Sequence, residues 1–169
     1  MRIIGIDPGY AIVGYGVLDY VKGRFSVVEY GAITTHKDTV FEKRLCEIYE
    51  DYCYLLDKHK PDALSMERLY FNTNRTTAID VAQARGIIAM ATAQRDIEIN
   101  EYTPLQVKQA VVGYGRAVKK QVQDMTRRIL NLDSVPKPDD TADALALAIC
   151  HAHTGSSLLS SINKMNAKG

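Results

Sequence analysis

The sequence has few cysteines, and their spacing does not suit a metal site. The three are Cys46, Cys53 and Cys150, an odd number for a disulfide framework. Cys46 and Cys53 would lie about 10 Å apart along one helix, which is too far for a disulfide bond. We therefore expect a reduced, cytoplasmic protein.

Long apolar runs are also missing. The N-terminus lacks the apolar region of a signal peptide, and no run approaches the roughly 20 residues of a membrane span. The 5 prolines and 11 glycines are scattered, so no long linker, repeat or low-complexity segment interrupts the chain. We predict no membrane partner and one domain over residues 1–155, followed by a flexible C-terminal tail over residues 156–169.

The net charge of +1 neither favours nor excludes a nucleic-acid partner. The distribution of charge is more informative, because residues 105–130 carry many bases and one acid, Asp124. The bases in this segment are Lys108, Arg116, Lys119, Lys120, Arg127 and Arg128. This excess predicts a basic surface for an anionic partner. The alternative is an ordinary solvated helix face.

Hydrophobic periodicity predicts an α/β protein. Strands are expected at residues 2–7, 14–20, 25–35, 63–69 and 97–102, with Lys22-Gly23 as a hairpin turn. Helices are expected at residues 40–59, 77–95, from Pro104 onward, 118–131 and 139–153. Three strands followed by alternating helices and strands predict a five-stranded mixed sheet with helices on both faces.

Two carboxylates are expected at neighbouring strand ends. Asp7 ends the first strand before Pro8-Gly9, where such sheets bind ligands, although a turn aspartate that caps its own loop is the alternative. Glu67 lies in a strand-like run, where a charged residue on a solvent-facing edge is the alternative. If the strands are adjacent, the two like charges require a cation between them.

Three further acids open the last predicted helix: Asp139, Asp140 and Asp143. Asp140 and Asp143 share one helix face, and Asp139 is a plausible N-cap. Acids in a first turn also favour the helix dipole, which is the structural alternative. Carboxylates from three elements together predict a hard-cation site, for which Mg²⁺ is well suited. Two such ions about 4 Å apart would support displacement at phosphorus.

Other site types find little support. His151 and His153 form a lone H-x-H pair, and we interpret them as surface residues rather than ligands. The glycines near Asp7 match neither a dinucleotide-binding nor a Walker motif, so they predict no nucleotide site.

Five motifs, taken in order, resemble the RuvC-type Holliday junction resolvases, and the resemblance extends from residue 2 to about residue 153. The first motif is weak alone, because several hydrolases and kinases begin similarly, but the five together are specific. They are Ile6-Asp7-Pro8-Gly9 with Gly14-Tyr15-Gly16; Met66-Glu67; Ala84-Arg85-Gly86; QVKQAVVG at 106–113; and DTADALA at 140–146.

This resemblance implies an RNase H-like fold and a homodimer that nicks four-way DNA junctions in pairs, with Mg²⁺ as cofactor and Mn²⁺ as a substitute. It also implies a branch-migration helicase complex as a partner. The family's metal-binding and catalytic acids fall on Asp7, Glu67, Asp140 and Asp143, with Asp139 as a rival for the third position.

The resemblance also implies DNA-binding residues. Lysines near the substrate phosphates fall on Lys108 and Lys119, with Lys120 assisting. An aromatic residue that stacks on opened bases falls on Tyr70, and Phe71 is a rival that we expect to be buried. Exposed residues of the second helix and the Tyr49/Tyr52 region are candidate dimer contacts.

The sequence is also compatible in part with three other functions. An actin- or sugar-kinase-like ATPase shares the first motif, but it needs a second glycine-rich loop and a second domain. An RNase H-fold nuclease that acts on RNA or linear DNA would use the same acids. A junction-binding module that does not cut would require the acids to be structural.

Overall fold

A computed structural model describes residues 1–68 and 75–166 of the chain. Strands and helices alternate after an initial three-stranded meander. In chain order the elements are β1 (Arg2–Asp7), β2 (Ile12–Val21), β3 (Arg24–Thr34), α1 (Phe41–His59), β4 (Ala63–Glu67), α2 (Arg75–Ala93), β5 (Glu98–Tyr102), α3 (Pro104–Val112), α4 (Lys119–Ile129) and α5 (Asp139–Asn166).

The strands form one mixed sheet in the order β3-β2-β1-β4-β5. β1 pairs antiparallel with β2 and parallel with β4, and β5 adds to β4 in parallel. Lys22 and Gly23 both have positive φ, at 50° and 81°, as a tight hairpin between β2 and β3 requires. The predicted five-stranded mixed sheet is confirmed.

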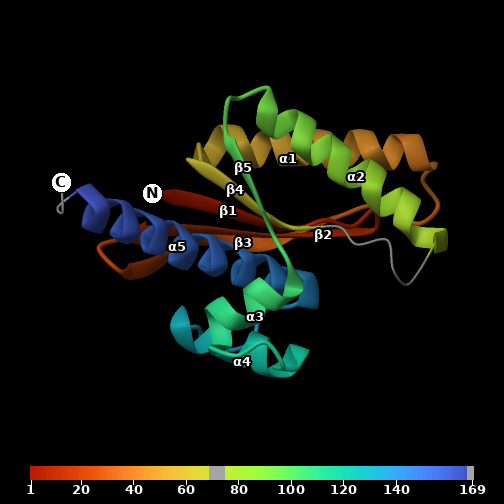
Figure 1. The fold of residues 1–169 in the computed structure, drawn as a ribbon. Coiled ribbons are helices and arrows are strands. Elements are labelled where there is room, and N and C mark those ends of the chain that lie inside the picture. Colours follow the sequence, from red (N-terminus) through yellow and green to blue (C-terminus); the bar gives the residue numbers. More distant parts are fainter. Residues whose placement is uncertain (69–74, 167–169) are drawn as a thin grey trace.

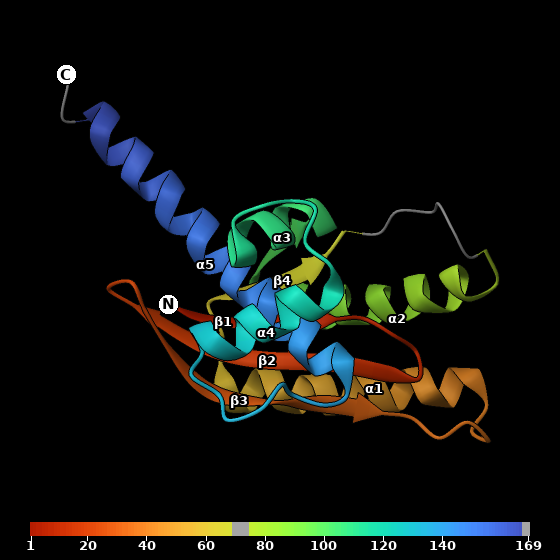
Figure 2. The same ribbon diagram turned by 90° about the horizontal axis from the view of Figure 1, so that it is seen from below.

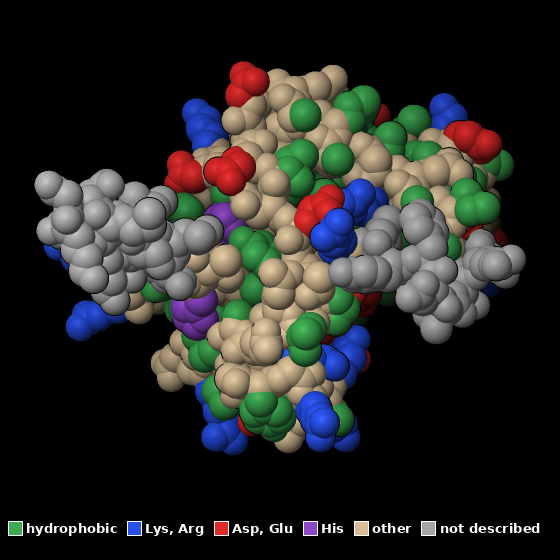
Figure 3. Space-filling view, in the orientation of Figure 1, with side chains coloured by type: hydrophobic (Ala, Val, Ile, Leu, Met, Phe, Trp, Pro, Cys, Tyr) green, Lys and Arg blue, Asp and Glu red, His purple; other side chains and the backbone are tan. Residues whose placement is uncertain are grey.

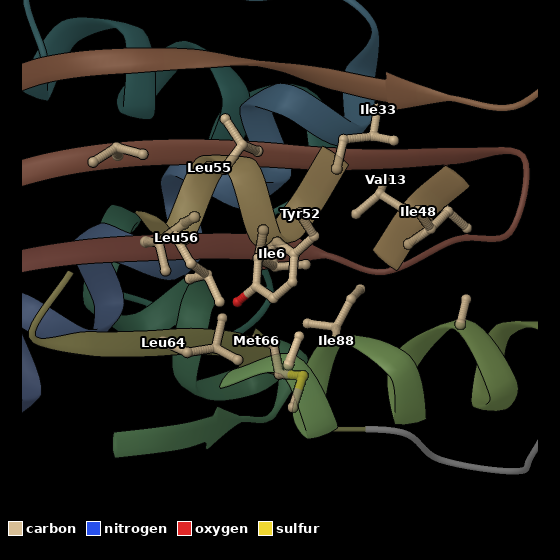
Figure 4. Packing of buried hydrophobic residues seen from close by; sticks show 14 residues of the cluster. Ile6, Val13, Ile33, Ile48, Tyr52, Leu55, Leu56, Leu64, Met66 and Ile88 are labelled. Carbon is tan, nitrogen blue, oxygen red and sulfur yellow. The ribbon is translucent and has the colours of Figure 1, made fainter. Parts of the chain in front are cut away.

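Helices cover both faces of the sheet, as predicted (Figure 1). On one face α1 and α2 pack over a large apolar core, in which Tyr52 reaches from α1 toward the strands (Figure 4). On the other face α5 lies against β1 and β2, and α3 and α4 pack on its outer side. Seen from below, α5 crosses the sheet obliquely (Figure 2).

Strand alternation assigns the side chains of β1 to these two layers. Ile4 and Ile6 enter the core under α1 and α2, whereas Ile3 packs with α5. Because successive residues point to opposite faces, Asp7 lies on the same face as Ile3, toward α5.

The contact between α5 and the sheet is made through glycines. A Cβ atom on Gly5 would overlap the main-chain carbonyl of Ala144, and one on Gly14 would overlap that of Asp140. No other residue fits at these two positions without moving the helix. The first turns of α5 therefore rest directly on the backbones of β1 and β2.

α5 continues to Asn166, so the expected helix end near residue 153 is wrong. A glycine such as Gly155 costs a helix only about 1 kcal/mol relative to alanine and does not have to end it. In the described part of the chain, none of the helices is both long and apolar enough to cross a membrane.

Two predictions about individual residues are also wrong. His151 is buried, and its Nδ1 is 2.7 Å from the hydroxyl of Tyr102, so it is not a surface residue. Tyr52 has no exposed surface, and its hydroxyl is 2.9 Å from that of Thr92, so it is not available as the candidate dimer contact. In both cases the helix face that carries the polar ring is turned toward the sheet.

Candidate active site

The four predicted acids come together where three elements meet. Asp7 is the last residue of β1 and Glu67 is the last residue of β4. Ile6 pairs with Met66 in the parallel register, so the next residue on each strand brings these two carboxylates side by side. Asp140 lies in the first turn of α5 and Asp143 in the turn that follows, above the same strand ends.

Two hydrogen bonds hold α5 against the sheet. The hydroxyl of Thr141 donates to the carbonyl of Gly31 on β3 at 3.0 Å. Further along, the hydroxyl of Ser65 on β4 donates to the carbonyl of Leu147 at 2.7 Å. The helix is thereby joined to strands on both sides of β1.

Burial and the neighbouring acids disfavour the ionised form of Asp7. Its pKa is raised from 3.8 to about 8, mainly by burial and then by the charges of Asp143, Glu67 and Asp140, in that order. Burial and Asp143 also raise the pKa of Glu67. Such a group of carboxylates needs a nearby cation to be fully charged at neutral pH.

One cation already lies among them. The ammonium of Lys119, at the start of α4, is 2.7 Å from Oδ2 of Asp143 and 3.9 Å from Oδ2 of Asp139. Its charge lowers the pKa of both Asp7 and Glu67, although less than burial raises them. The hydrogen bond to Asp143 in turn raises the pKa of Lys119.

A pocket of about 290 Å³ opens beside the acids. Glu67 and Asp143 line it together with Lys108 of α3 and Lys119 of α4, and α3, α4 and α5 add apolar walls. In Figure 3, Lys and Arg side chains gather on the part of the surface where Figure 1 places α3 and α4. The basic segment predicted from charge therefore adjoins the acidic cluster.

Asp139 and Asp140 are neighbours in the sequence but have different surroundings. Asp139 is 2.5 Å from the ammonium of Lys137, and this hydrogen bond, partly opposed by burial, lowers its pKa. Asp140, by contrast, is one of the acids whose charge raises the pKa of Asp7. Asp140 is thus the better candidate for the third acidic position.

The donor set fits a divalent metal ion, since four carboxylates from three elements supply the oxygen ligands that hard cations prefer. As the side chains stand, no three acid, histidine or cysteine groups among residues 1–68 and 75–166 are gathered closely enough to hold an ion. Lys119 lies against Asp143 in this arrangement.

The remaining predicted site residues lie in different surroundings. Lys120 follows Lys119 on α4 and is exposed. Tyr70 and its rival Phe71 lie outside the described residues.

Sequence reasoning missed the ion pair between Lys119 and Asp143. A signal for it was present, because Lys119 and Lys120 begin a helix, where the dipole disfavours positive charge. Lysines in that position indicate that an acidic group on another element stabilises them.

An RNase H-like sheet with acids at adjoining strand ends and a helix start defines a metal-dependent phosphodiester nuclease as the class of protein. Comparison with known families identifies which nuclease family the chain belongs to. The sequence model of the family described as "Crossover junction endodeoxyribonuclease RuvC" matches residues 3–151. The chain belongs to this family of divalent-metal-dependent nucleases, which excludes the kinase-like ATPase interpretation.

Individual relatives agree. The RuvC protein of Alkaliphilus metalliredigens is 57% identical over 155 residues, which cover 92% of this chain and 94% of the relative. The structure of Thermus thermophilus RuvC superposes with a TM-score of 0.86 at 32% identity, covering 93% of this chain and 96% of that one. A structure of T. thermophilus RuvC in complex with Holliday junction substrate gives 0.86 at 31% identity, covering 92% and 94%.

Proposed function

We propose that this protein is a Mg²⁺-dependent endonuclease that resolves four-way DNA junctions in recombination and repair, with Mn²⁺ as a substitute ion. The observation that carries the proposal is the convergence of Asp7, Glu67, Asp140 and Asp143 beside a basic surface. Membership of the RuvC family supports the substrate, since a relative of the same fold forms a complex with a Holliday junction.

The four carboxylates would hold the metal, which supplies an activated water and stabilises charge at the reacting phosphorus. Asp7 and Glu67 are fixed by strand backbones, and Asp140 and Asp143 are fixed by the helix that rests on those strands. The elements that carry the acids are therefore in place before substrate arrives, and only side-chain movements are left to bring the carboxylates onto an ion.

The lysines and the aromatic residue act on DNA rather than on metal. Lys108 and Lys119 line the pocket beside Glu67 and Asp143, where their ammonium groups would contact phosphates that flank the cut. Lys120 would add a further contact from the exposed side of α4. We assign to Tyr70 the stacking on an unpaired base near the junction centre, which is worth about 1–3 kcal/mol.

We further propose that the active unit is a homodimer. Resolution requires nicks in two strands of like polarity, and an isologous dimer places two identical sites about one axis. Exposed apolar residues on α2, Ile79 and Met90, support that helix as the contact. Tyr52 is buried and is withdrawn as a dimer contact.

The proposal also covers the protein's partner and its location in the cell. A branch-migration helicase complex would deliver the junction. The three free cysteines support a reducing, cytoplasmic location.

A cruciform carried on a supercoiled plasmid tests the proposal. Wild-type homodimers with Mg²⁺ should yield linear DNA, and EDTA should abolish the cut. Heterodimers of wild-type and Asp7→Asn subunits should yield nicked circles. Linear product from the heterodimer, or full activity of a sedimenting monomer, would contradict the dimer. Equal cutting of RNA or of linear duplex would contradict the substrate assignment.

A further inference from the structure

Lys119 makes its close contact with an acid of the proposed metal site. Its ammonium is 2.7 Å from Oδ2 of Asp143, and its charge also acts on Asp7 and Glu67. One ammonium thus attracts carboxylates from β1, β4 and α5. A positive charge in this position relieves part of their mutual repulsion.

The local chemistry of α4 does not account for a cation at this position. Lys119 is the first residue of the helix and Lys120 is the second, and the first turn contains no acid. The preceding residue, Val118, provides no side-chain cap. Positive charge at a helix start opposes the helix dipole, so Lys119 gains its stabilisation from α5 instead.

Lys108 provides an internal contrast. It lines the same pocket, but within the described residues it forms no ion pair with an acid. Both lysines therefore line the pocket, but only Lys119 of the two forms an ion pair with a proposed metal ligand.

We propose that Lys119 is an internal counter-cation of the acidic site, and that a divalent ion has to displace its ammonium from Asp143 in order to bind there. The inference rests on the proposed function, because it takes the four acids as the metal ligands. Before the metal binds, Lys119 offsets part of the negative charge of the acids and holds the start of α4 against α5. Displacement then frees the same ammonium for a substrate phosphate.

This arrangement has a measurable consequence in the absence of DNA. The side chain of Lys119 is 59% exposed, so its ion pair is of the modest strength usual near a surface. Its removal should therefore tighten the binding of a divalent ion by roughly 1.5- to 5-fold. The metal-free protein should simultaneously lose thermal stability, because the acids lose their counter-charge.

Isothermal titration calorimetry with CaCl₂ on DNA-free protein tests the proposal. Lys119→Met should bind Ca²⁺ more tightly than wild type, whereas Lys108→Met, which removes an equal charge from the same pocket, should change the affinity less. Lys119→Arg retains the cation and should not tighten binding. In thermal melts, Lys119→Met should melt below wild type in EDTA, and the difference should shrink or reverse in saturating CaCl₂.

The outcomes separate this inference from the proposed function. Unchanged or weaker Ca²⁺ binding by Lys119→Met, or an equal effect of Lys108→Met, would overturn the counter-cation role. Equal Ca²⁺ binding by wild type and Asp7→Asn would instead overturn the assignment of the acids as a metal site. A melting difference between wild type and Lys119→Met that Ca²⁺ leaves unchanged would also contradict displacement.

Discussion

The hydroxyl of Ser65 donates a 2.7 Å hydrogen bond to the main-chain carbonyl of Leu147. Ser65 lies on β4, two residues before Glu67 and on the same face of the strand. Leu147 lies one helical turn after Asp143 on α5. This bond therefore links the two elements that carry acids, close to both carboxylates.

Ser65→Ala should lower the free energy of unfolding by about 1 kcal/mol, because a buried hydrogen bond is lost. It should also weaken divalent-ion affinity, since α5 can then shift relative to β4. Urea denaturation and calorimetry measure the two effects. Thr154→Ala removes a similar hydroxyl-to-carbonyl bond, to Cys150 within α5, and is a suitable control. Equal ion affinity in the two variants would argue against a positioning role for Ser65.

Asp7→Asn, Glu67→Gln, Asp140→Asn and Asp143→Asn should each reduce junction cleavage by about 100-fold or more, since even indirect support of a metal ligand is commonly worth 10- to 100-fold. Junction binding should persist, because phosphate attraction comes from the lysines. Cleavage and gel-shift assays on a synthetic junction measure both. Asp139→Asn should retain most activity, because Asp139 pairs with Lys137. Full activity in any of the four variants would remove that residue from the site.

The stability of the metal-free protein should fall as the pH rises from about 4 to about 8. Asp7 has a pKa of about 8 in the folded protein, against 3.8 ordinarily, so the folded state retains a proton that the unfolded state releases. The unfolded state then binds fewer protons, and the slope of unfolding free energy against pH is negative. The raised pKa of Glu67 acts in the same direction.

Urea midpoints measured in EDTA between about pH 5 and pH 8 check this slope. Asp7→Asn should flatten it, whereas Asp139→Asn should not, because the pKa of Asp139 is lowered rather than raised. Mg²⁺ should stabilise the protein increasingly toward high pH, as the acids ionise. A slope that Asp7→Asn leaves intact would exclude Asp7 as its source.

Lys108→Ala and Lys119→Ala should weaken junction binding and reduce its dependence on salt. Each phosphate contact that is lost should change the slope of log affinity against log salt by about 0.9 on duplex DNA. Fluorescence anisotropy from low to moderate salt, in Ca²⁺, measures the slope. Arg24→Ala, at the hairpin remote from the acids, should leave it unchanged. An unaltered slope in a lysine variant would show that this lysine does not contact the backbone.

Hydrophobic patterning predicted the elements well because the central strands are short apolar runs and α1 carries a clear apolar stripe. It placed β1, α1 and β5 to within a residue or so, and it gave the correct sheet class. It could not place the end of α5, because Gly155 is compatible with either a stop or a continued helix. His151 was expected on the surface but is buried, because a polar ring on a helix does not reveal which way that face is turned.

The proximity of the four acids was predictable because strand ends and helix starts determine where side chains meet, whereas their role as metal ligands stays a prediction. Choosing between Asp139 and Asp140 required coordinates, since adjacent residues on a helix point in different directions and Lys137 engages Asp139. The contact between Lys119 and Asp143 depends on how α4 packs on α5, which no local pattern encodes. Tyr70 remains a prediction from family resemblance.

The glycines that contact α5 limit which substitutions this sequence can accept. Where Gly5 and Gly14 meet the helix backbone, no side chain separates strand from helix. Exchanges of core residues elsewhere can therefore alter volume without changing the separation between Asp7 and Asp140. We therefore expect substitutions elsewhere in the core to affect the proposed metal site little, while these two positions in the sheet tolerate no side chain at all.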